Sequence, residues 1–69
     1  MEYDQIELNQ IVKINMDPEA ALYVEEYQGC EGMVSAKDSP ECVGVDVTLK
    51  DGTIDPDVGF KPSELEKVD

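Results

Sequence analysis

The strongest constraint on the fold is a strict alternation of residue types in CVGVDVTLKDGTI, residues 42–54. Four apolar residues fall on one side of an extended chain: Val43, Val45, Val47 and Leu49. A period of two is typical of a β-strand with one buried face. Asp51 and Gly52 follow, and an Asp-Gly pair favours a two-residue type I′ turn, in which both central residues have positive φ. The stretch therefore predicts a β-hairpin.

Similar alternation predicts two earlier strands. Residues 10–16 place Val12, Ile14 and Met16 on one face. Residues 32–36 place Val34 and Ala36 on one face, with Met33 and Ser35 on the other. Such runs of β-branched residues with period two favour strands over helices. We expect both segments to pair with the central hairpin.

Turn-forming residues separate these strands. KDSPE, residues 37–41, is a turn by composition. We expect hairpin pairing to stop at residues 55–57 (Asp-Pro-Asp) and a strand to resume at residues 58–60. PSEL then predicts one helical turn capped by Ser63, followed by a last short strand at residues 66–68.

Residues 17–29 change character and predict one short helix. Asp17 can cap its N-terminus, Pro18 suits the first helical position, and Gly29 can end it in the left-handed region. Before the first strand, Ile6 and Leu8 are two apart, which fits either a short strand or an ordered lead-in. We predict a single domain over residues 1–69, with residues 1–5 flexible.

The chain is strongly acidic. It has 69 residues, with 17 Asp and Glu against five Lys, no Arg and no His, for a net charge of −12. High charge with modest hydrophobicity also marks disordered chains, but the alternation of apolar residues favours a folded domain. An anionic surface repels phosphates and anionic lipids, so we expect no direct contact with nucleic acid or membranes and a basic protein partner instead.

Two features that the sequence lacks bear on the cellular compartment of the protein. No apolar run approaches the length of about 20 residues that spans a membrane, and the first ten residues lack the basic and apolar segments of a signal peptide. We therefore expect a cytoplasmic protein, in which Cys30 and Cys42 are reduced, partly buried thiols.

The predicted order of elements resembles the SH3-like small barrel. QGCEGMV, residues 28–34, is similar to the G-x-x-G-x-V core of KOW-type domains, and VGFKPSELEKV, residues 58–68, is similar to the end of SH3 folds. The resemblance covers residues 10–68 and implies an antiparallel barrel of about five strands with one short helix.

The chain differs in two ways from the members of these families that bind their usual ligands. ALYVEEY, residues 21–27, resembles the ALYDY segment of peptide-binding SH3 domains, but the chain has no Trp to grip a proline-rich ligand. KOW-type domains that bind RNA carry basic residues, whereas this chain carries five Lys. The resemblance therefore implies a fold and leaves the ligand open.

Catalysis and metal binding are weaker readings. The acidic residues include no constellation with His or Arg, so we expect no enzyme and no cofactor. Asp51, Asp55 and Asp57 cluster in DGTIDPDVG and offer oxygen ligands for calcium, but they lack EF-hand spacing. A plain turn explains the same residues, and the alternative of a cation stays open.

The acidic surface is the main functional candidate. We predict a non-catalytic interaction module that binds a basic partner; the alternative is a phage-type DNA mimic that inhibits a restriction enzyme, a CRISPR nuclease or RNA polymerase. Two copies of the chain could also pair through their edge strands, so a homodimer stays open as an alternative. We expect one of Tyr23 and Tyr27 to lie in the core. The other, if it is exposed, adds an aromatic contact with the basic partner. The predicted partner-binding residues are Tyr23, Glu25, Glu26, Tyr27, Asp46, Asp55, Asp57 and Phe60.

Overall fold

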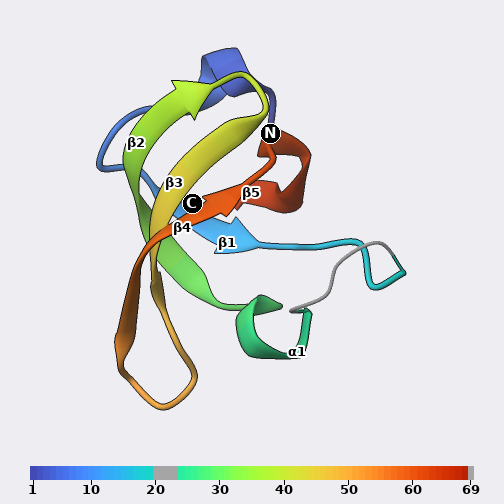
Figure 1. Cartoon of the computed structure of the whole chain (residues 1–69), viewed down its shortest axis with the longest axis vertical. Helices are drawn as coiled ribbons and strands as arrows, with labels where there is room; N and C mark the ends of the chain where they lie inside the picture. The colour runs from blue at the N-terminus through green and yellow to red at the C-terminus, as the bar shows by residue number, and fades with distance from the viewer. Residues whose placement is uncertain (20–23, 69) are drawn as a thin grey trace.

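The computed structural model describes residues 1–19 and 24–68. Within them, five antiparallel strands form one bent sheet in the order β4-β3-β2-β1-β5 (Figure 1). The strands are β1 (Ile11–Ile14), β2 (Glu31–Ser39), β3 (Cys42–Thr48), β4 (Ile54–Phe60) and β5 (Leu65–Lys67). The shorter elements are the helix α1 (Val24–Tyr27) and two 3-10 turns, η1 (Tyr3–Gln5) and η2 (Pro62–Glu64). The predicted mainly β fold, with about five antiparallel strands and one short helix, is confirmed.

The sheet is open, and this corrects the expectation of a closed barrel. Its two ends, β4 and β5, have no ladder between them in the described chain. Two features of the sequence account for this. β5 has only three residues, which pair with β1, and β4 carries Pro56, which has no N–H to donate to a further strand.

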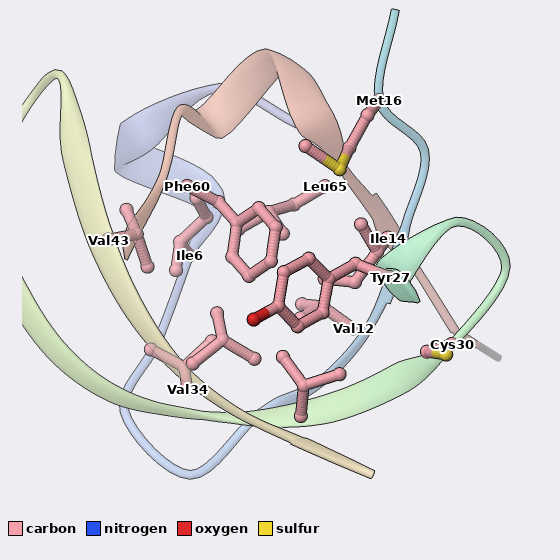
Figure 2. Packing of buried hydrophobic residues seen from close by; sticks show 12 residues of the cluster. Ile6, Val12, Ile14, Met16, Tyr27, Cys30, Val34, Val43, Phe60 and Leu65 are labelled. Atoms are coloured by element: carbon pink, nitrogen blue, oxygen red, sulfur yellow. The ribbon is translucent and has the colours of Figure 1, made fainter. Parts of the chain in front are cut away.

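The core forms around β3, which lies between β2 and β4. Val43, Val45 and Val47, here called the valine row, are all 0% exposed. Burying such a side chain stabilises a fold by about 1.5–3 kcal/mol. The other members of the core cluster, all labelled in Figure 2, are Ile6, Val12, Ile14, Met16, Tyr27, Cys30, Val34, Phe60 and Leu65. The predicted inward faces of residues 12–16 and 43–47 are thus confirmed. Ala36 differs from the prediction: it is half-buried and pairs with Gly44 rather than with a residue of the valine row, because the register shifts after Val34.

Gly32 lets β2 approach β3 closely where the sheet bends. A methyl group at Gly32 would lie 2.6 Å from Val45 Cγ1 and 2.7 Å from the Asp46 carbonyl oxygen. Further along, the register between β2 and β3 shifts between Val34 and Ala36. Irregularities of this kind increase local twist and bend the strand. Together they curve the sheet around its small aliphatic core.

The tip of the hairpin differs from the predicted type I′ turn. Gly52 has a φ of +90°, whereas Asp51 is not among the described residues with positive φ. The Gly52 N–H donates to the Leu49 carbonyl at 2.9 Å, and the Leu49 N–H donates to the Thr53 carbonyl at 2.7 Å. These bonds close a three-residue loop, which needs left-handed backbone only at its last residue.

The described part of the excursion between β1 and β2 contains one helix, α1. Asp17 caps a turn there, because its Oδ1 accepts the Glu19 N–H at 3.0 Å. The described helix is α1 alone, and residues 20–23 lie outside the described chain. Gly29 has a φ of +81°, which confirms the predicted left-handed end. No helix of the described chain is long and apolar enough to cross a membrane.

The lead-in to β1 is ordered rather than a strand. Ile6 is buried at 1% exposure, while Leu8 is 57% exposed. The Asn9 N–H donates to the Val34 carbonyl at 2.8 Å and so ties the lead-in to β2. Ahead of it, the Met1 ammonium group donates to the Leu65 carbonyl at 2.7 Å. The flexibility of residues 1–5 in solution stays a prediction.

Four predicted boundaries are corrected. The turn predicted at residues 37–41 shrinks to Pro40 and Glu41, because Ser39 still pairs with Cys42. β4 continues through residues 55–57 with a bulge, where pairing was expected to stop. The cap of η2 is Lys61 rather than Ser63, and β5 begins at residue 65.

The valine row provides a direct test of the fold. Val47→Asp should abolish folding, because an unpaired carboxylate in an apolar core costs several kcal/mol and a domain this small has about 3–5 kcal/mol of stability. Leu8→Asp is the matched control, since it makes the same change in charge at an exposed site. Circular dichroism should show an unfolded Val47→Asp and a folded control. A native spectrum and melting point for Val47→Asp would contradict the assigned register.

Candidate functional site

Three of the predicted partner-binding residues come together at the edge of the core. The Tyr27 hydroxyl donates to Asp55 Oδ2 at 2.6 Å, and the Tyr27 ring packs edge-on against Phe60 with centroids 5.7 Å apart. Tyr27 is 9% exposed and Phe60 is 3% exposed, and Figure 2 shows both rings inside the cluster. These aromatic side chains hold α1 on the sheet, so the predicted surface contact is not available to them in this structure.

The two glutamates of α1 remain on the surface. Glu25 and Glu26 are both exposed. Lys50 Nζ donates to the Glu25 carbonyl at 2.9 Å, which ties the helix to the loop between β3 and β4. The Glu26 carbonyl accepts the Cys30 thiol at 3.5 Å. Tyr23, the fourth predicted residue of this segment, lies outside the described chain.

Asp46 and Asp57 form a second group, on the opposite side of β3 from the valine row. The Asp57 N–H donates to Asp46 Oδ1 at 2.9 Å. Asp57 has a φ of +55°, in the left-handed region that Asp tolerates better than most residues. A methyl group at Gly44 would lie 2.7 Å from Asp57 Oδ1. The glycine in the alternating strand therefore makes room for this carboxylate, a role that the sequence pattern did not reveal.

The three aspartates considered for a cation go to different partners. Asp51 Oδ1 accepts both the Thr53 hydroxyl, at 2.6 Å, and the Thr53 N–H, at 3.0 Å. Asp55 Oδ2 accepts the Tyr27 hydroxyl, and the main-chain N–H of Asp57 donates to Asp46 Oδ1. No group of three His, Cys, Asp or Glu residues in the described chain is arranged to hold a metal ion. The hydrogen bonds give each aspartate a structural role in its own turn, bulge or helix contact.

An open groove of about 590 Å³ lies on the outer face of the sheet. We call it the outer groove; its lining residues are Ile11, Gly29, Glu31, Gly32, Met33, Asp46, Thr48 and Ile54. Asp46 is the one predicted partner-binding residue among them. The apolar residues were missed because they stand at the positions that alternation assigns to solvent. Their signal was an apolar residue, such as Ile11 or Met33, on the polar face of a predicted strand.

The bond between Tyr27 and Asp55 can be tested by mutation. Tyr27→Phe should lower the free energy of unfolding by about 1 kcal/mol, because it removes a hydrogen bond to a charged acceptor that is partly open to water. Tyr3→Phe is the control, since its hydroxyl makes a long contact of 3.5 Å. Urea denaturation measures both. Combining Tyr27→Phe with Asp55→Asn should cost less than the sum of the two single changes, and strict additivity would contradict the bond.

The hydrogen bonds from the Thr53 hydroxyl and N–H lower the pKa of Asp51 below its ordinary value of 3.8. A lowered folded-state pKa adds stability above the unfolded pKa, and this contribution is lost as pH falls through the folded value. Thr53→Val removes the hydroxyl and should raise the Asp51 midpoint towards 3.8, as followed by carboxyl NMR. Thr48→Val should leave that midpoint unchanged. An equal midpoint in Thr53→Val and the parent chain would refute the hydrogen-bond origin of the lowered pKa.

The predicted site residues of the described chain thus divide between a buried contact at α1 and surface carboxylates on α1 and on the outer face of the sheet. The chain matches no family model, no curated protein and no solved structure with which it was compared. The functional argument therefore rests on the geometry of these two groups.

Proposed function

We propose that this protein is a non-catalytic interaction module whose acidic surface binds a basic protein. The observation that carries the proposal is the separation of charge from the core. The described chain buries no polar or charged residue, and its core consists of aliphatic and aromatic side chains with one Cys. The charged residues of the described chain, which carry all of the net charge of −12 except that of Asp69, are therefore on the surface.

Two of the five lysines do little to offset this charge locally. Lys37 Nζ lies 4.3 Å from the centroid of the Tyr3 ring, and Lys50 donates to a main-chain carbonyl. Both cations thus serve packing and tethering roles rather than masking carboxylates. A surface of one sign attracts partners of the other sign and speeds their encounter.

The SH3-like order gives this surface a scaffold. We propose that the sheet is an open variant of that architecture. Three features support the resemblance: the long excursion between β1 and β2, the hairpin of β3 and β4, and the η2 turn before β5 returns to β1. Cys30 and Cys42 are free thiols, which supports a cytoplasmic location as part of the proposal.

Edge-to-edge pairing of two copies is less favoured than binding a basic protein. β4 presents Pro56 and a bulge at its outer edge, and both features hinder strand pairing. Two copies would also bring together two net charges of −12. Size-exclusion chromatography of the purified chain tests for a homodimer.

Salt dependence provides the test of the proposal. The tagged chain should capture basic proteins from its native host at low salt and release them steeply as salt rises. A variant carrying Asp46→Asn and Asp57→Asn, or one carrying Glu25→Gln and Glu26→Gln, should elute the partner at lower salt. Each pair removes two exposed or half-buried carboxylates and keeps side-chain shape. Capture that neither variant nor salt alters would contradict an electrostatic module.

The DNA mimic is separated in the same experiment. Duplex DNA should displace the chain from its partner if both occupy one basic groove. If the partner instead binds the chain and DNA together, mimicry is excluded while the interaction module stands.

A further inference from the structure

The exposed apolar residues gather in one place. Four large hydrophobic side chains are exposed in the described chain: Leu8, Ile11, Met33 and Ile54. Three of the four line the outer groove, and Leu8 does not. Single exposed apolar residues are common on protein surfaces, whereas a group of them on one face marks an interaction site. In so acidic a chain, this grouping needs an explanation.

Strand register brings these residues together from three strands. Ile11 of β1 lies opposite Met33 of β2, and Met33 lies opposite Asp46 of β3. In the neighbouring row, Glu31 of β2 lies opposite Thr48 of β3, which lies opposite Ile54 of β4. The two rows form an apolar floor, and each row includes one carboxylate. A sheet holds such a surface rigidly, which favours binding with little loss of conformational entropy.

The carboxylates determine which occupant fits. Asp46 accepts the Asp57 N–H through Oδ1, so Oδ2 can still accept a hydrogen bond from a partner. The Asp57 carboxylate lies beside Gly44 on the same face. At the Glu31 end of the outer groove, Lys13 of β1 lies opposite Glu31 of β2 in the register. The carboxylate of Asp46, with that of Asp57 on the same face, therefore gives the Asp46 end of the outer groove a negative charge.

We propose that the outer groove binds a segment of a basic protein that inserts one apolar side chain between Met33 and Ile54 and places a flanking Lys or Arg against Asp46. The proposal rests on the proposed function and assigns it a site. A second copy of the chain fits poorly, because its own charge is −12. Arg pairs well with a carboxylate and also covers apolar surface with its stem, so it suits both parts of the groove.

Two synthetic heptapeptides test the site: Lys-Lys-Arg-Phe-Arg-Lys-Lys and the same peptide with Ser in place of Phe. Both carry the same charge, so they differ only in the apolar side chain. The Phe peptide should bind about tenfold more tightly, since burying most of a large apolar side chain is worth about that factor. When the Phe peptide binds, the amide chemical shifts of the protein should change most at Ile11, Met33, Thr48 and Ile54. Fluorescence anisotropy and NMR titration at low salt measure the two effects.

Variants of the chain separate the groove from the general charge. Met33→Ser and Ile54→Ser should each reduce the advantage of the Phe peptide to less than about threefold, because each removes part of the apolar floor. Leu8→Ser, at an exposed apolar residue outside the groove, should keep that advantage. All three sites are exposed, so circular dichroism should show native spectra. Should Met33→Ser lose its native spectrum, Ile54→Ser on the edge strand carries the test alone.

The outcomes distinguish the two proposals. Equal affinity for the Phe and Ser peptides, or chemical-shift changes away from the groove, overturns the groove and leaves the electrostatic module standing. Failure of both peptides to bind at low salt overturns the proposed function together with the groove. A preference for the Phe peptide that Leu8→Ser keeps and Ile54→Ser loses supports the site.

Discussion

Burial of the valine row is the interaction on which the rest of the structure depends. β3 lies between β2 and β4 and pairs with both, so its inward face sets the register of two neighbours. In a chain of 69 residues the core is small, and the valine row supplies three of the twelve buried hydrophobic residues of the described chain. Gly32 contributes by removing the one side chain that would hold β2 away from Val45 and Asp46. The bend of the sheet follows from this close approach.

The same constraint distributes the charge. Because every inward position on β3 is taken by valine, the polar residues of that strand turn outward, where Asp46 meets the bulge of β4. The bulge has two effects. It places Asp57 in a left-handed conformation, and it interrupts the regular pairing of the edge strand β4. A small apolar core and an acidic exterior are thus two results of one alternating pattern. The outer groove is the place where that pattern admits apolar residues on the outside.

Alternation predicted the strands well, because a buried face imposes period two on residues close in sequence. It predicted less where tertiary contacts decide. The Asp51 loop adopts a three-residue form because its carboxylate bonds Thr53, and Tyr27 lies in the core because Asp55, far away in sequence, accepts its hydroxyl. The open sheet reflects the short pairing of β5, which composition does not encode. The outer groove depends on cross-strand register, so Ile11 and Ile54 could not be joined from the sequence alone.

Amide hydrogen exchange at neutral pH measures the central claim most directly. If β3 is a buried inner strand of the sheet, paired on both sides, the amides of Val43, Val45 and Val47 should exchange together, at the slow rate set by global unfolding. The amides of the loop at residues 50–52 should exchange far faster and serve as the internal reference. Exchange of the valine amides at the rate of that loop would contradict a scaffold built on the valine row.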